Sequence, residues 1–286
     1  MKRTKEKISD LTTYRFGGVC ENVVTIESVE DVLHIEDEIR DNNYYIIGKG
    51  SNVAFSDKSF EKLLLIPQIN NISIDSSTLE VSTGSGVFLP DLSRKLYNHS
   101  LTGGEFLLGI PGSVGGAIRM NAGCWGSEIS NILQSITVYD FNNKTIKTIE
   151  KSQFKFGYRD GDFLKNYLIL SGKFQFLKSN KDDIYKIMSE LNTKRKSSQP
   201  SAIYNAGSVF KNPEKNSAGY LIESCGLKGF SIDKVRVSEK HANFFIAEKG
   251  AKAISLYELV QHVKNVVKEK HDVLLEEEIK FVGNFE

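Results

Sequence analysis

The sequence predicts a mixed α+β protein, and three features of the chain indicate this class. A strand, a helix and a second strand follow one another between Val24 and about Leu65. Short β-rich runs then occupy the stretch from Leu63 to Phe176. Two segments with helical periodicity lie beyond Lys178. With 286 residues, the chain is long enough for about two domains.

The first predicted unit is of the strand, helix, strand type. Its expected strands are 23–26 and 44–47, and the run Ser28 to Asp31 between them resembles the capping box that begins a helix. Glycines follow the second strand. The next part of the chain predicts a second α+β layer packed on the first, with strands at 72–74, 79–82, 136–139 and 168–170 and a short helix over about 89–97.

The composition changes near Lys178, where we place the boundary between two domains, 1–177 and 178–286. The helix that follows carries apolar residues at i, i+3, i+4 and i+7, namely Ile184, Ile187, Met188 and Leu191. A second capping box, Ser255-Leu-Tyr-Glu258, predicts the start of a helix with one apolar face. The last predicted strand, 274–282, contains three consecutive glutamates.

Charge and cysteine content argue against several classes of protein. Lys and Arg number 37 against 36 Asp and Glu, so binding of nucleic acid through bulk charge is not expected. The longest aliphatic stretch, Leu63 to Ile66, is far shorter than the ~18 residues of a membrane span, and the N-terminus lacks the apolar core of a signal peptide. We therefore expect a cytoplasmic protein without a membrane segment. The three cysteines and five histidines show no ligand spacing, so neither a metal site nor a disulfide framework is expected.

Two glycine-rich segments are the first candidates for chemistry. Gly48-Lys-Gly-Ser-Asn52 follows a predicted strand, where glycines let backbone N–H groups approach an anion, although an ordinary turn would also explain it. It is not the dinucleotide-binding fingerprint, because position 53 is valine and no helix pattern follows. Gly109-Ile-Pro-Gly-Ser-Val-Gly-Gly-Ala117 and Asn121-Ala-Gly123 combine glycines with apolar residues and little charge. Together, the segments indicate a nucleotide-type cofactor whose pyrophosphate would meet N–H groups and the Ser113 hydroxyl.

These segments resemble the flavin-binding half of the UDP-N-acetylenolpyruvoylglucosamine reductases, the FAD enzymes of bacterial cell-wall precursor synthesis. Further motifs follow in that family's order: Phe156-Gly-Tyr-Arg-Asp160, Asn205-Ala-Gly-Ser-Val-Phe-Lys-Asn-Pro213, Ala218–Glu223, Gly226–Gly229, His241-Ala-Asn-Phe244 and Leu275–Gly283. The resemblance covers nearly the whole chain. It implies an FAD-binding half of two α+β subdomains, split near residue 66 and similar to vanillyl-alcohol oxidase (PCMH-like), followed by a smaller α+β substrate-binding domain.

The resemblance also implies a reaction and its cofactors. NADPH would reduce FAD, and the reduced flavin would reduce UDP-N-acetylglucosamine enolpyruvate to UDP-N-acetylmuramate. No protein partner is indicated. The residues expected to bind FAD lie in the glycine-rich segments: Gly48, Lys49, Gly50, Ser51, Asn52, Gly109, Pro111, Gly112, Ser113, Gly116, Ala117, Asn121 and Gly123.

Three residues match the catalytic positions of the family. Arg159 would hold the substrate carboxylate and the developing enolate, Ser208 would donate a proton to C2, and Glu278 would help to stabilise or protonate the intermediate. Each residue also has an ordinary explanation, which is a surface ion pair for Arg159, a turn for Ser208 and a charged edge strand for Glu278. The expected substrate contacts are Tyr158, Arg195, Lys211, Asn212 and His241.

Two other functions are compatible with parts of the pattern. A flavin oxidase of the same superfamily would leave Ser208, Asn212 and the C-terminal motif unexplained. A flavin- or nucleotide-binding module without catalysis would have no need of Arg159, Ser208 and Glu278 together. The chain departs from several members of the family at Cys124 and Ala247, and it resembles the shorter type that lacks a tyrosine-bearing insertion after Asn212.

Overall fold

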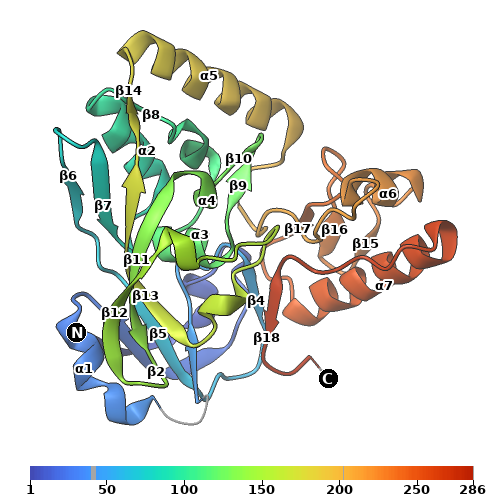
Figure 1. Ribbon diagram of the computed structural model, residues 1–286. Helices are drawn as coiled ribbons and strands as arrows, with labels where there is room; N and C mark the ends of the chain where they lie inside the picture. Colours follow the sequence, from blue (N-terminus) through green and yellow to red (C-terminus); the bar gives the residue numbers. More distant parts are fainter. Residues whose placement is uncertain (40–42, 202, 286) are drawn as a thin grey trace. The chain divides into compact units, whose positions relative to one another are not determined.

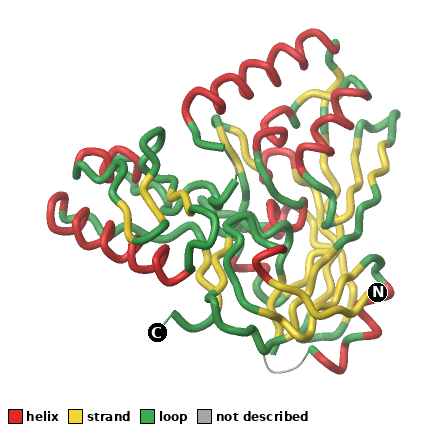
Figure 2. The backbone as a smooth tube through the Cα atoms, turned by 180° about the vertical axis from the view of Figure 1, so that it is seen from behind, coloured by secondary structure: helices red, strands yellow, loops and turns green. Residues whose placement is uncertain are grey.

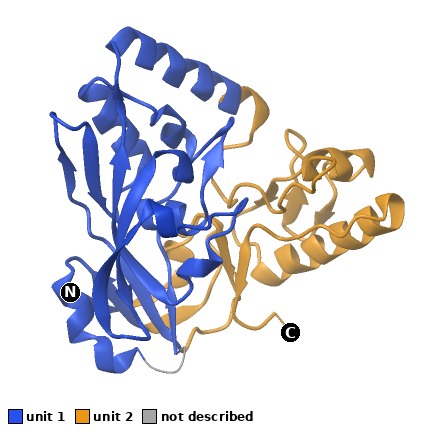
Figure 3. Ribbon diagram, viewed as in Figure 1, with its two compact units in different colours: residues 1–4, 22–49, 62–195 blue, residues 5–21, 50–61, 196–286 orange. Residues whose placement is uncertain are grey.

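The computed structural model describes residues 1–39, 43–201 and 203–285 (Figure 1). The chain forms two compact units, which Figure 3 shows in different colours. Unit 1 contains residues 1–4, 22–49 and 62–195, and unit 2 contains residues 5–21, 50–61 and 196–286. The α+β class is confirmed. The functional domains 1–177 and 178–286 stay a prediction, since the compact units follow a different division of the chain.

A four-stranded sheet contains the first predicted strands. Its order is β1 (Lys2–Lys7), β2 (Val19–Ile26), β5 (Leu63–Pro67) and β3 (Tyr44–Ile46), and β5 runs parallel to both β2 and β3. The strand, helix, strand unit is therefore present, with β5 inserted between its two strands. The helix α1 (Glu30–His34) follows a reciprocal pair of hydrogen bonds, because Ser28 Oγ accepts the Asp31 N–H at 3.3 Å and Asp31 Oδ2 accepts the Ser28 N–H at 3.1 Å.

A five-stranded antiparallel sheet forms the second layer of unit 1. Its order is β12 (Thr145–Glu150), β11 (Leu133–Asp140), β13 (Tyr167–Gln175), β7 (Glu80–Gly84) and β6 (Ile72–Ile74). Alternate residues of β13 enter different cores. Leu168 and Leu170 pack in the core shared with β2 and β5, whereas Ile169 packs with the helices α2 (Leu89–Asn98) and α3 (Val114–Arg119). The predicted packing of one layer on the other is confirmed.

The remaining elements of unit 1 are short, except for one long helix. Strands β8 (Leu101–Thr102) and β14 (Leu177–Lys178) pair, as do β9 (Gly123–Cys124) and β10 (Ser127–Glu128), and α4 covers Ile129–Ile132. The helix α5 (Lys181–Ser198) buries Ile184 and Met188, but Ile187 is 40% exposed. The apolar stripe of α5 is therefore narrower than its spacing predicts.

Unit 2 packs two helices, a small antiparallel sheet and a parallel strand pair around a core of its own. The helices are α6 (Ala218–Ser224) and α7 (Ala253–His271), the sheet is β15 (Ser231–Ile232), β16 (Val235–Val237) and β17 (Phe245–Ala247), and the pair is β4 (Val53–Phe55) with β18 (Lys280–Val282). The predicted apolar face of α7 fills this core. Figure 2 shows that loops and turns connect most of these short elements.

Two local predictions for unit 2 are wrong. The helix α7 begins at Ala253, so Ser255 lies inside its first turn, and the Ala253 N–H donates instead to Asp57 Oδ2 at 2.9 Å, 196 residues away in the sequence. The last strand covers only Lys280–Val282, because the preceding residues form an isolated bridge between Glu277 and Phe210. In the described part of the chain, no helix has the length and apolarity needed to cross a membrane.

Candidate active site

The two predicted cofactor segments meet in unit 1 at Gly48 and Ser113. A Cβ atom built on Gly48 would lie 2.4 Å from Ser113 Oγ, so this approach requires glycine. Ser113 is buried, and its Oγ accepts the Gly116 N–H at 3.4 Å at the start of α3. Gly48, Ser113 and Gly116 therefore belong to one tightly packed cluster of backbone and hydroxyl groups.

A third loop, which was not predicted from the sequence, completes this cluster. The Gly115 N–H donates to Ser85 O at 2.8 Å, and a Cβ on Gly115 would lie 2.9 Å from Ser85 Cβ. Ser85 is 1% exposed, and its hydroxyl has no hydrogen-bond partner among the described residues. Since an unpaired buried hydroxyl is unfavourable, a polar group of a ligand would fit here. The sequence signal was Gly84-Ser-Gly86, a third place where backbone can approach closely.

Arg159 lies beside the third predicted cofactor segment. Its Nη1 donates to Asn121 O at 3.3 Å and its Nη2 donates to Gly123 O at 2.6 Å. The turn from Gly157 to Asp160 that carries it is closed by a pair of backbone hydrogen bonds, both of 3.3 Å. The guanidinium carbon lies 5.2 Å from the centroid of the half-exposed Tyr158 ring. The structure thus brings Arg159 and Tyr158 together with Asn121 and Gly123.

A second arginine, Arg195 of α5, lies against Gly109. A Cβ on Gly109 would be 3.1 Å from Arg195 Nη1. Burial lowers the pKa of Arg195, and no carboxylate among the described residues forms an ion pair with it. Burial raises the pKa of the Cys124 thiol, while Arg195 and then Arg159 act to lower it, so both guanidinium groups act on one thiol. A partly buried cation of this kind suits an anionic ligand.

Ser208 and Glu278 are neighbours in unit 2, because Val209, the residue after Ser208, is hydrogen-bonded to the backbone of Glu278. Val209, which follows Ser208, donates its N–H to Asn243 O at 2.8 Å and accepts the Glu278 N–H at 2.8 Å. Asn52 adds a second connection, since its Nδ2 donates to Glu278 O at 3.1 Å. Ser208 follows Gly207, which adopts a left-handed φ of 79°. The backbone therefore brings together Ser208, Glu278 and the predicted cofactor residue Asn52.

The two glutamates before Glu278 have structural partners. Glu276 forms an ion pair with Lys211, and Glu277 forms one with Lys264 at 2.6 Å. Lys211 also donates its backbone N–H to Glu276 O at 2.9 Å. The Lys211 ammonium, a predicted substrate contact, is thus engaged by a carboxylate in this structure.

His241 and Asn212 lie near the start of α6. His241 Nδ1 accepts the Asn243 N–H at 3.2 Å, so the proton of the neutral ring is assigned to Nε2. Burial lowers the pKa of His241, which favours the neutral form. Asn212 Oδ1 accepts the Ala218 N–H at 3.0 Å and so fixes the start of the helix. His241 is positioned as a neutral donor, and Asn212 already has a local role.

Two buried asparagines that were not singled out from the sequence support the Ser208 segment. Asn243 forms hydrogen bonds with both backbone groups of Phe210. Its Nδ2 donates to Phe210 O at 2.8 Å, and its Oδ1 accepts the Phe210 N–H at 3.0 Å. Asn205 Oδ1 accepts the Gly207 N–H at 3.1 Å. Both asparagines belong to motifs noted in the sequence, Asn-Ala-Gly-Ser and His-Ala-Asn-Phe. A motif alone does not show which of its residues support the backbone and which take part in the reaction.

Comparison with known proteins gives a consistent result over the whole chain. Residues 20–149 match the family described as an FAD binding domain, and residues 199–282 match the C-terminal domain of UDP-N-acetylenolpyruvoylglucosamine reductase. Among curated relatives of that name, the protein of Clostridium botulinum is 36% identical over 97% of this chain and 91% of its own, and that of Clostridium novyi is 38% identical over 96% and 90%.

A solved structure agrees with the sequence comparison. The crystal structure of UDP-N-acetylenolpyruvylglucosamine reductase from Thermus caldophilus is similar, with a TM-score of 0.85 and 28% identity. The similarity covers 99% of this chain and 100% of that one.

Proposed function

The chain belongs to the UDP-N-acetylenolpyruvoylglucosamine reductase family, and from this premise we propose how its own residues carry out the reaction. It is a flavin oxidoreductase of peptidoglycan precursor synthesis that reduces UDP-N-acetylglucosamine enolpyruvate to UDP-N-acetylmuramate. The observation that carries the assignment is the similarity over nearly the full length of both chains. When bound, FAD supplies the transfer of two electrons from NADPH to the enolpyruvyl double bond.

In this proposal, the cofactor is held by the glycine-rich segments. The close approach of Gly48 to Ser113 and the unpartnered hydroxyl of Ser85 fit a ligand that packs on backbone and accepts or donates hydrogen bonds. The residues assigned to it are Gly48, Lys49, Gly50, Ser51, Asn52, Gly109, Pro111, Gly112, Ser113, Gly116, Ala117, Asn121 and Gly123.

Arg159 is proposed to bind the substrate carboxylate and the negative charge that develops on it. Reduction at C3 leaves an enediolate, and a planar guanidinium can bind its two oxygens through parallel hydrogen bonds. Support comes from the way the Asn121 and Gly123 carbonyls direct the guanidinium. A group fixed in advance stabilises the transition state more than one that must reorganise.

Ser208 is proposed to donate the proton to C2, and Glu278 to act with it. A serine hydroxyl is a weak acid, so a neighbouring carboxyl group that supplies or relays a proton would make the transfer easier. The shared backbone partner Val209 supports this pairing, as it places the two residues on adjacent segments.

The remaining assignments concern the residues that contact the substrate, the location of the protein in the cell, and its electron donor and partners. Tyr158, Arg195, Lys211, Asn212 and His241 are proposed substrate contacts, and Arg195 has the strongest support because it is a partly buried guanidinium without a carboxylate partner in the described ranges. We also propose a cytoplasmic location, NADPH as the electron donor, and no nucleic acid or obligate protein partner.

Anaerobic stopped-flow absorbance tests the function directly. The flavin-loaded protein is reduced with NADPH and then mixed with UDP-N-acetylglucosamine enolpyruvate. We expect NADPH to bleach the flavin spectrum, and the substrate to restore it rapidly with formation of UDP-N-acetylmuramate. Recovery of the spectrum with oxygen but not with this substrate would contradict the assignment and favour an oxidase.

A further inference from the structure

Asn121 forms hydrogen bonds with three separate parts of unit 1. Its Nδ2 donates to Gly157 O at 3.2 Å, its Oδ1 accepts the Ser130 N–H at 3.0 Å, and its backbone O accepts from Arg159 Nη1 at 3.3 Å. The residue is 1% exposed, so these contacts are shielded from water. The buried side chain of Asn121 thus joins the start of α4 to Gly157, at the base of the turn that carries Arg159, and the backbone carbonyl of Asn121 accepts from the guanidinium.

The Arg159 turn needs this kind of support. Arg159 has a φ of 53°, a left-handed conformation that is unfavourable for residues other than glycine. Two backbone hydrogen bonds between Gly157 and Asp160 close the turn, but both are long, at 3.3 Å. A strained residue keeps its conformation only when its surroundings fix it. The bond from Asn121 Nδ2 attaches the base of the turn to the buried interior.

The chemistry of position 121 favours asparagine. It has a φ of 41°, which asparagine tolerates better than most residues. The amide is a donor at one end and an acceptor at the other, as Gly157 O and the Ser130 N–H require. Aspartate would keep the acceptor for Ser130 but would place a carboxylate oxygen against the Gly157 carbonyl. Glycine would keep the backbone conformation and lose both side-chain bonds.

We propose that Asn121 is a positioning residue for Arg159, which it holds at two points, the base of the turn and the guanidinium. This inference rests on the proposed function of Arg159 and differs from the assignment of Asn121 to the cofactor alone. Asn121 sets the direction of the guanidinium toward the substrate carboxylate. Its loss therefore slows the step in which Arg159 acts more than it slows the transfer of electrons from NADPH.

The experiment measures the two half-reactions of Asn121→Gly by anaerobic stopped-flow absorbance. We expect reoxidation by the enolpyruvyl substrate to slow by about a hundredfold, the order expected when a binding group is displaced by about 1 Å, and reduction by NADPH to slow much less. Asn121→Asp, which keeps the acceptor for Ser130, is expected to slow the same step. Flavin content and thermal unfolding are measured for each variant. Asn143→Gly serves as a control, because Asn143 also bonds through its side chain in a turn of unit 1, to Asp140.

A double-mutant cycle with Arg159→Lys separates action through Arg159 from independent action. If Asn121 acts through Arg159, the double variant Asn121→Gly with Arg159→Lys will be no slower in reoxidation than Arg159→Lys alone. Fully additive effects would overturn the proposal. So would loss of flavin with equal slowing of both half-reactions, which would assign Asn121 to the cofactor.

The same measurements distinguish failure of the inference from failure of the proposed function. If Arg159→Lys itself reoxidises at the wild-type rate, the role of Arg159 is wrong and the inference fails with it. If Arg159→Lys is slow while both Asn121 variants behave as wild type, only the positioning role is wrong.

Discussion

At the scale of single residues, backbone strain gathers around Arg159. Arg159, Asn121 and Trp125 all have left-handed φ values, of 53°, 41° and 57°. Such a conformation costs about 1 kcal/mol each at Arg159 and Trp125, and less at Asn121, because asparagine tolerates it better. Strain of this kind is retained where neighbouring groups fix it, and it is common at functional sites. The carbonyls of Asn121 and Gly123 that accept from Arg159 lie in this same strained segment.

Ser208→Ala tests the proton-donor role. Removal of the hydroxyl takes away the proposed donor to C2 but leaves the groups proposed to bind FAD. Reduction of the flavin by NADPH is therefore expected to be nearly unchanged, while reoxidation by substrate slows by orders of magnitude, about the 10²–10⁴-fold contribution of a general acid. Stopped-flow absorbance reports both steps. Equal slowing of the two steps would instead indicate that Ser208 supports the flavin pocket.

Gly48→Ala tests the contact between the two cofactor segments. The new methyl group would lie 2.4 Å from Ser113 Oγ, so the serine must rotate and give up its bond to the Gly116 N–H. We expect a loss of about 1–3 kcal/mol in the free energy of unfolding, measured with chemical denaturant.

Ser113→Ala provides the matched background for that test. It costs about 1 kcal/mol as a lost helix cap. It also removes the clashing oxygen, and Ser113 Cβ would then lie at an ordinary 3.7 Å from the new methyl group. Gly48→Ala should therefore cost little more in this background, and simple addition of the two losses would contradict the steric explanation.

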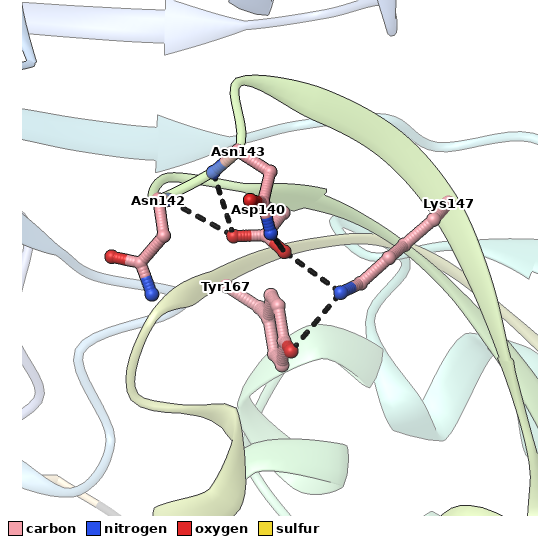
Figure 4. Close-up of polar contacts among 5 residues, drawn as sticks. All are labelled: Asp140, Asn142, Asn143, Lys147 and Tyr167. Atoms are coloured by element: carbon pink, nitrogen blue, oxygen red, sulfur yellow. Dashed lines mark hydrogen bonds and ion pairs between the residues drawn. The ribbon is translucent and has the colours of Figure 1, made fainter.

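At the scale of elements, a buried carboxylate fixes the end of the hairpin formed by β11 and β12 (Figure 4). Asp140 is 1% exposed and accepts hydrogen bonds from Lys147 Nζ at 2.7 Å and Asn143 Nδ2 at 2.8 Å, besides the N–H groups of Asn142 and Asn143. Lys147 also donates to Tyr167 Oη at 3.2 Å and so connects β12 to β13. These bonds, with that from Lys147 as the main contribution, lower the pKa of Asp140 to about 2.

This lowered pKa predicts how stability depends on pH. The unfolded chain takes up the proton near the ordinary value of 3.8, before the folded protein does, so the contribution of Asp140 is complete above about pH 4 and is lost as the pH falls through about 2. Asp140→Asn should therefore flatten the fall in unfolding free energy over this range. Lys147→Met should flatten it partly, since it removes the main hydrogen bond. Denaturation with urea at a series of acidic pH values measures both, and a slope unchanged in Asp140→Asn would contradict the prediction.

Across the molecule, unit 1 contains two hydrophobic cores and unit 2 contains one, and the units are interleaved in the sequence. The core of unit 2 takes Tyr14, Phe16 and Ala54 from the N-terminal quarter of the chain, and all three are at most 2% exposed. The Tyr14 hydroxyl donates to Phe245 O at 3.0 Å, and β4 is the parallel partner of β18. The C-terminal part of unit 2 therefore depends on segments from the beginning of the chain.

Expression of residues 178–286 alone tests this dependence. The fragment lacks Tyr14, Phe16 and Ala54 and the strand that pairs with β18, and truncation of one large buried aromatic residue already costs about 3–5 kcal/mol. We expect no cooperative unfolding transition by circular dichroism. Addition of a peptide covering residues 5–61 should restore part of the structure. A cooperative transition in the isolated fragment would show that the predicted division at Lys178 defines an independent folding unit.

Features that depend on local pattern and on motif could be predicted from the amino-acid sequence. Strand alternation, the apolar face of α7 and the Ser28–Asp31 box are short-range effects of periodicity and capping, and the spaced motifs were sufficient to identify the family. Contacts between distant segments became visible only in the folded chain. Asp57 caps α7 across 196 residues, Gly48 meets Ser113, and Asn121 connects Arg159 to α4. Such contacts depend on how the chain closes on itself, and no local propensity specifies which distant groups then become neighbours.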